Sequence, residues 1–222
     1  MNVLALDGAL GGFSAAVACE NRVTASVRET GNVALERGLV LLQSVLDGAG
    51  MPAERLDRLA VGIGPGGFTG LRIAIAYAKA LAAAWRLPLV PISSFDLLEY
   101  GGSFDRVLTI VAGRPDVISA RYRCGAEIKR ASGRIAEVLD ELLPPSASHP
   151  QSGSTELDVV GASKDVLHAL AERGNPVHFL DPAVTPAAAA VALAAGSCAP
   201  PASLHEVRAD YGELPAAKAP KL

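Results

Sequence analysis

Residues 62–72 read Gly62-Ile63-Gly64-Pro65-Gly66-Gly67-Phe68-Thr69-Gly70-Leu71-Arg72, a glycine-rich run that marks a sharp change of chain direction. A short apolar run from Leu59 to Ile63 predicts a strand directly before it, and residues 69–85 predict a helix directly after it. The glycines match the pattern G-x-G-x-x-G, which between a strand and a helix can hold a phosphate on the helix N-terminus. They also suit a steric role, because glycine lets a chain turn sharply.

A dinucleotide site is the less favoured interpretation of these glycines. That fingerprint expects an acidic residue about 20 residues beyond the last glycine, at the end of the next strand. Here the next strand ends in Pro91-Ile92-Ser93-Ser94, and the first carboxylate is Asp96. The fingerprint also usually opens the first strand-helix-strand unit, whereas three predicted strands and a helix come before this turn. We therefore expect a structural turn formed by Gly62, Gly64, Pro65, Gly66, Gly67, Phe68, Thr69 and Gly70.

Outward from the turn, the chain has the same order of elements twice. Apolar or alternating runs separated by turn residues predict strands at 3–7, 13–19 and 22–28, and helical spacing predicts a helix at 34–49. The first half is completed by a strand at 59–63, a helix at 69–85 and a strand at 87–92. The second half predicts strands 106–112, 116–123 and 126–131, helix 134–143, strand 157–161, helix 164–173, strand 177–180 and an Ala-rich helix after Pro186.

Two βββαβα units predict an α/β protein with two related lobes, because the apolar faces of each mixed sheet need helices to cover them. We assign residues 1–100 to an N-terminal lobe that carries the glycine turn, and residues 101–214 to a C-terminal lobe. Residues 144–154 are rich in Pro and Ser, which is typical of a surface loop. The tail 215–222 predicts disorder.

Composition argues against several classes of protein. The 222 residues carry a formal net charge of −3 without long runs of one sign, which disfavours a nucleic-acid-binding surface. The absence of a long apolar run and of a basic N-terminal segment predicts a cytoplasmic protein without a membrane span. We expect no metal and no other cofactor, because the cysteines and histidines lack metal-binding spacing: Cys19, Cys124, Cys198, His149, His168, His178 and His205.

The complete run 62–72 resembles the signature of the bacterial TsaB (YeaZ) family. The similarity continues through the lysine-containing helix Ile73-Ala74-Ile75-Ala76-Tyr77-Ala78-Lys79-Ala80-Leu81-Ala82 and through Val90-Pro91-Ile92-Ser93-Ser94. The resemblance implies the actin-like fold of sugar kinases and heat-shock ATPases, with two related lobes. It also implies a non-catalytic subunit that pairs with the threonylcarbamoyl transferase subunit in making threonylcarbamoyladenosine in tRNA. A separate P-loop ATPase then joins the complex, and contact with tRNA is indirect.

The sequence departs from the family pattern in three places. Asp7 is followed by Gly8-Ala9-Leu10, where relatives carry hydroxyl side chains near a phosphate. The family's His-Ser-Glu string corresponds to Ala34-Leu35-Glu36-Arg37, and its D-A-R segment to Ala112-Gly113-Arg114. We therefore expect no catalytic residue, and we expect Asp7 to serve as a turn residue. The alternative is a nucleotide-binding small-molecule kinase of the same fold.

Two helices are the expected pairing surface. In helix 69–85 the alanines leave a smooth face, and Arg72, Lys79 and Arg86 recur every seven residues on one side. Helix 34–49 is apolar over a wider arc than one sheet needs. We expect a partner to contact Leu35, Leu39, Leu42, Leu46, Arg72, Ala76, Lys79, Ala80 and Ala83. The same surface suits a homodimer of the isolated chain, and the sequence leaves open which pairing is preferred.

Overall fold

The computed structural model describes residues 1–20, 22–31, 36–113, 115–144, 156–174, 176–196 and 199–212. Within these ranges the strands are β1 (Val3–Asp7), β2 (Phe13–Cys19), β3 (Arg22–Glu29), β4 (Arg58–Gly62), β5 (Leu89–Ile92), β6 (Arg106–Ala112), β7 (Val117–Cys124), β8 (Glu127–Arg134), β9 (Leu157–Val160) and β10 (Val177–Leu180). The helices are α2 (Gly38–Gly48), α3 (Phe68–Trp85), α4 (Ser94–Glu99), α5 (Ile135–Leu142), α6 (Lys164–Glu172) and α7 (Pro186–Gly196), with short 3₁₀ turns η1 (Ala53–Arg55) and η2 (Leu204–Glu206).

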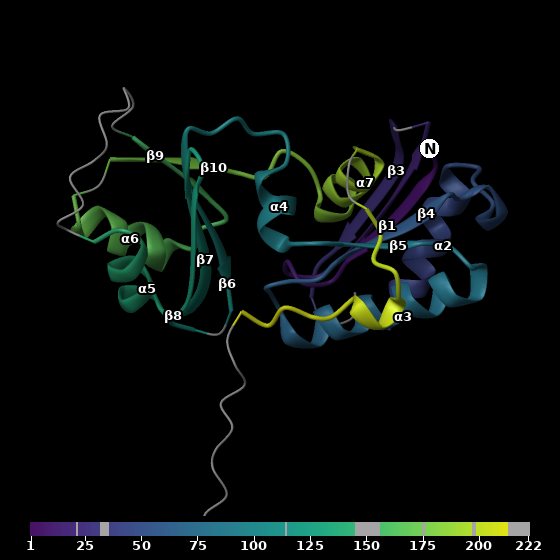
Figure 1. Ribbon diagram of the computed structural model, residues 1–222, viewed down its shortest axis with the longest axis horizontal. Helices are drawn as coiled ribbons and strands as arrows, with labels where there is room; N and C mark the ends of the chain where they lie inside the picture. The colour runs from purple at the N-terminus through teal and green to yellow at the C-terminus, as the bar shows by residue number, and fades with distance from the viewer. Residues whose placement is uncertain are drawn as a thin grey trace, which may run out of the picture.

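The two halves of the chain form two sheets with the same topology (Figure 1). The first sheet has the order β3-β2-β1-β4-β5, and the second has the order β8-β7-β6-β9-β10 when written in the same direction. In each sheet the first three strands pair antiparallel, and the two later strands pair parallel. The predicted α/β fold with two related βββαβα lobes is therefore confirmed.

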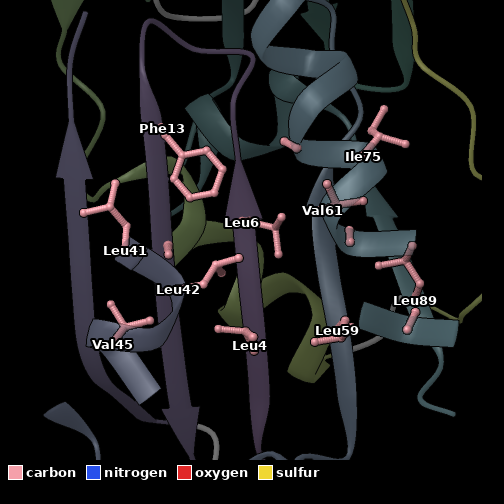
Figure 2. Close-up of a cluster of buried hydrophobic side chains, with 14 of the residues drawn as sticks. Leu4, Leu6, Phe13, Leu41, Leu42, Val45, Leu59, Val61, Ile75 and Leu89 are labelled. Atoms are coloured by element: carbon pink, nitrogen blue, oxygen red, sulfur yellow. The ribbon is translucent and has the colours of Figure 1, made fainter. Parts of the chain in front are cut away.

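Alternation along β1 sends side chains to two separate cores. Leu4 and Leu6 point to the face covered by α2 and α3, whereas Val3 and Ala5 point to the opposite face. Figure 2 shows the first of these cores, in which Leu41, Leu42 and Val45 of α2 approach the sheet. Full burial of each such leucine stabilises the fold by about 1.5–3 kcal/mol relative to leaving it exposed.

Helix α7 covers the other face of the first sheet, although it lies in the second half of the sequence. Its alanines 187, 189 and 190 are fully buried against Ala5, Ala16, Ala18 and Ala60 of the strands. Small side chains on both surfaces let the helix lie close to the sheet. Because α7 is apolar on every side, its sequence has no solvent face, which is typical of a helix buried in a core.

Helix α4 lies between the two lobes and contacts both (Figure 1). Its Leu97 packs into the core beneath α7, while Phe95 and Leu98 pack against the second sheet. Buried Arg121 of β7 lies 2.6 Å from Asp96 and 2.9 Å from Glu99 of this helix, measured between guanidinium nitrogen and carboxylate oxygen. Apolar contact and ion pairing together therefore join the second lobe to α4.

The last described residues, 199–212, return to the first lobe and run alongside α3 (Figure 1). We call this segment the C-terminal strap. Val207 of the strap is fully buried in the core beneath α2 and α3, and Leu204 and Ala209 pack against that core. The strap ends against the second lobe, because a Cβ added to Gly212 would meet the Ser119 hydroxyl of β7.

Candidate functional site

The glycine turn joins β4 to α3 and packs backbone against backbone. Gly64 has a φ of +100°, and a Cβ added there would lie 2.1 Å from the carbonyl oxygen of Asp210. A Cβ added to Gly66 would lie 2.4 Å from the carbonyl oxygen of Ala9. The peptide between Gly64 and Pro65 is cis. These glycines are required because the chain approaches its neighbours too closely for any side chain.

Two backbone N–H groups of the glycine turn and of the turn that faces it are used within the chain. The N–H of Gly67 donates to the carbonyl oxygen of Ala9 at 2.8 Å, so it points into the protein. On the facing turn after β1, the N–H of Leu10 donates to Asp7 Oδ1 at 3.2 Å. No hydroxyl side chain follows Asp7 in that turn. Two possible donors to a phosphate are therefore occupied, and no hydroxyl group assists the remaining ones in the turn after β1.

Asp7 is an enclosed carboxyl group that is 2 % exposed. Burial raises its pKa from 3.8 to about 6, against the opposing influence of backbone N–H donors from Leu10 and Ala9 and of the Arg28 charge. Its Oδ2 has no hydrogen-bond partner among the described residues and faces Gly62, where an added Cβ would lie 2.0 Å from that oxygen. The carboxyl thus stabilises the turn after β1 and leaves no room for a ligand at Gly62.

Helix α3 presents a smooth stripe of small side chains to the outside. Of the predicted contact residues, Arg72, Ala76, Ala80 and Ala83 are exposed, and Lys79 is half-buried. The opposite side of the helix packs in the first core through Leu71, Ala74, Ile75, Ala78 and Ala82. The exposed positions recur every three or four residues, so they form one continuous surface.

Helix α2 contributes less to this surface than the sequence predicted. Leu39 is exposed, and so is its neighbour Val40, which we had not predicted. Leu42 is buried in the first core (Figure 2). Leu46 is buried in the same core, so the prediction that these two leucines contact a partner is wrong. The wide apolar arc of α2 is satisfied by packing within the chain. Leu35 lies outside the described residues.

The beginning of α3 carries an aromatic cluster that joins the motif to the C-terminal strap. Phe68 and Thr69 of the motif are both exposed. The ring of Phe68 lies 5.1 Å from that of Tyr211, measured between centroids, and the Arg72 guanidinium lies 5.2 Å from the Phe68 centroid. Nothing local in the sequence predicted the contribution of Tyr211, because it comes from a segment about 140 residues away.

Other kinds of site find little support in the described part of the chain. No group of three or more His, Cys, Asp or Glu side chains there is arranged to hold a metal ion. No described helix is long and apolar enough to cross a membrane. Predictions for Arg114, Cys198, His149, most of the loop 144–154 and the tail 215–222 fall on residues outside the described ranges.

Comparison with known proteins identifies the family. The family model described as TsaD: tRNA N6-adenosine threonylcarbamoyltransferase matches residues 34–195, more than half of the chain. The chain belongs to this family. Its TsaB/YeaZ character is also confirmed: it is 33% identical over 128 residues to the tRNA threonylcarbamoyladenosine biosynthesis protein TsaB of Escherichia coli (strain K12). That match spans 55% of this chain and 55% of the relative, so it covers about half of the relative's length.

Solved structures of TsaB/YeaZ-type proteins match over almost the whole chain. YeaZ from Pseudomonas aeruginosa superimposes with a TM-score of 0.64 at 25% identity, covering 95% of this chain and 99% of that one. Component A of (R)-2-hydroxyglutaryl-CoA dehydratase from Acidaminococcus fermentans gives a TM-score of 0.50 at 11% identity, with 86% and 95% coverage, which shows the fold alone. The actin-like fold predicted for this TsaB/YeaZ-type chain is therefore confirmed.

Proposed function

We propose that this chain is a non-catalytic subunit in the biosynthesis of threonylcarbamoyladenosine in tRNA, and that it pairs with the threonylcarbamoyl transferase subunit. The observation that carries the proposal is the exposed face of α3. Three cations, Arg72, Lys79 and Arg86, lie along a helix that has no acidic residue. Within the described ranges none of them makes an ion pair, so a partner with acidic side chains would complement this helix.

The shape of this face suits a second helix. Helices pack with their axes 8–10 Å apart, and the smallest separations require small side chains at the contact. Ala76, Ala80 and Ala83 provide such a surface over nearly two turns. Leu39 and Val40 of the neighbouring helix α2 add apolar area, and Gly38 of α2 lies against Tyr77 of α3. An apolar centre with charges around it is the usual composition of a protein interface.

We propose a non-catalytic role because the turn after β1 and the glycine turn close on each other. Asp7 is buried against Gly62, and the N–H of Gly67 is bonded to Ala9, so neither faces a substrate. Both groups are thus unavailable to the phosphates of a nucleotide. Calorimetric titration with ATP and magnesium should therefore give no heat of binding, and stoichiometric binding would favour a nucleotide-binding kinase of the same fold.

The remaining partners follow from the same proposal. We expect a P-loop ATPase to join the assembled pair rather than the isolated chain. We expect tRNA to be held mainly by the transferase subunit, since this chain has a formal net charge of −3. In isolation the chain should form a homodimer through the same face of α3. Native mass spectrometry of the chain alone should show the homodimer. After addition of the transferase subunit it should show the heterodimer in place of the homodimer.

Replacement of Ala80 by glutamate tests the proposed face. The larger side chain prevents close approach of a second helix, and its charge repels acidic groups on the partner. The matched control is Ala171→Glu, an exposed alanine on α6 of the second lobe. Size-exclusion chromatography of each variant with the transferase subunit should show loss of the complex for Ala80→Glu and retention for Ala171→Glu. An intact complex with a folded Ala80→Glu variant would refute the proposed face.

A further inference from the structure

The aromatic cluster at the start of α3 is unusually exposed for such large side chains. Phe68 is 56% exposed and Tyr211 is 40% exposed, yet their rings contact each other and Arg72 lies over Phe68. A large aromatic group left in water gains little for the folding of the chain. It gains much more when a partner covers it, which is why Tyr, Trp and Arg are enriched among the residues that dominate binding energy.

The strap holds Tyr211 in place before any partner arrives. The N–H of Asp210 donates to the carbonyl oxygen of Ile63 at 2.7 Å, and the N–H of Gly212 donates to Asp210 Oδ1 at 2.9 Å. Gly212 also lies against Pro65 of the glycine turn. Because its two neighbours are fixed by these contacts, Tyr211 loses little conformational entropy on binding, and pre-organisation of this kind increases affinity.

The charges around the cluster indicate what it would bind. In the described part of the chain, Arg72 makes no ion pair, and its guanidinium is placed over an aromatic ring. Such a guanidinium still has several N–H donors for a carboxylate. The ligand that fits therefore combines an apolar group, for the rings of Phe68 and Tyr211, with a carboxylate for Arg72.

An exposed aromatic pair beside an arginine also resembles a surface on which nucleobases stack. Two features favour a protein instead. The cluster continues into the small apolar side chains of Ala76, Ala80 and Ala83, which suit the close approach of a second helix. The strap also places the carboxylate of Asp210 next to Tyr211, which disfavours a polyanion at this end of the helix.

We propose that Phe68, Arg72 and Tyr211 form the anchor of the pairing surface, and that they bind an apolar side chain and a neighbouring carboxylate on the transferase subunit. This inference rests on the proposed function and extends it from one helix to a composite surface. The C-terminal strap is then part of the interface, and the conformation of the glycine turn positions both Phe68 and Tyr211. The glycine motif thus acts in binding through the aromatic residue that follows it.

Isothermal titration calorimetry with the transferase subunit tests the anchor. Tyr211→Ala should weaken binding at least tenfold, as expected for a residue that dominates an interface. Tyr211→Phe keeps the ring and should bind within about twofold of the wild type, because no hydrogen bond of the hydroxyl is part of the anchor. The matched control is Phe179→Ala, since Phe179 on β10 is also 40% exposed but belongs to the second lobe. The Phe179→Ala variant should bind the transferase subunit with the affinity of the wild type.

A second pair of variants keeps the test independent of the strap's stability. Arg72→Gln preserves the helix and removes the charge, so it should weaken binding at least fivefold at low salt, whereas Lys164→Gln on α6 should not. Wild-type affinity in Tyr211→Ala or Arg72→Gln would overturn the anchor while leaving the proposed pairing intact. Failure of the wild-type chain to bind would overturn the pairing itself. Binding of tRNA by the chain alone that is lost in Tyr211→Ala would assign the cluster to RNA and overturn the proposal.

Discussion

Replacement of Asp7 by asparagine tests whether this carboxyl group is enclosed as the structure indicates. The pKa of Asp7 is about 6 in the folded chain and 3.8 when the group is free in water. Between about pH 4 and pH 6 the folded chain therefore holds a proton that the unfolded chain has released. Stability falls as the pH rises through this window, and the loss stays constant above it. About two pKa units correspond to about 3 kcal/mol.

Asparagine has nearly the same size and can accept the hydrogen bond from Leu10, but it does not titrate. Urea unfolding followed by circular dichroism at pH 4, 5, 6 and 7 gives the free energy of unfolding of both proteins. The difference should shift by about 2.5 kcal/mol in favour of Asp7→Asn between pH 4 and pH 7, since the unfolded carboxyl is already partly ionised at pH 4. Asp165→Asn, at an exposed site on α6, is the control and should show no such shift. If the curves of Asp7→Asn and wild type stay parallel, the carboxyl group is not enclosed.

Two further substitutions test the packing that positions the candidate surface. Gly64→Ala should lower the free energy of unfolding by about 3 kcal/mol or more, because the new Cβ collides with the Asp210 carbonyl at a positive φ. Gly48→Ala at the end of α2, where no atom lies within 4 Å of the new Cβ, should be neutral or slightly stabilising in the same urea experiment. Arg121→Met should cost about 3 kcal/mol, since it leaves the buried carboxylate of Glu99 with fewer partners. Adding Glu99→Gln to this variant should recover part of the loss. If the losses caused by Arg121→Met and Glu99→Gln are strictly additive, the ion pair between Glu99 of α4 and Arg121 of the second lobe does not contribute to stability.

Strands and long helices were predictable because each repeats one local pattern. The structure has β1, β2, β6 and β10 with the predicted bounds, since turn residues limit each run on both sides. The short helix α4 was not predicted, because six residues are too few to show a helical period. Its apolar side chains are explained only by the two lobes on either side of it. The position of α7 was equally unpredictable, since an alanine-rich helix has no polar side to orient it.

The candidate surface was only partly predictable for a similar reason. The spacing of Arg72, Ala76, Ala80 and Ala83 indicates one helix face wherever the helix lies, and the structure leaves that face exposed. The leucines of α2 show an apolar arc but not which part of it the sheet covers, so Leu42 and Leu46 were assigned wrongly. Tyr211 was missed because its contact with Phe68 depends on the path of the strap through the whole fold.

Photo-cross-linking from α3 shows directly whether this helix face meets the transferase subunit. A benzoylphenylalanine placed at Ala84, which is exposed beside the alanine stripe and not part of it, reports any chain that lies close to this face. We expect a covalent product with the transferase subunit from position 84 and none from position 171, on the exposed side of α6. A product from position 171, or from neither position while the complex still forms, would contradict this expectation.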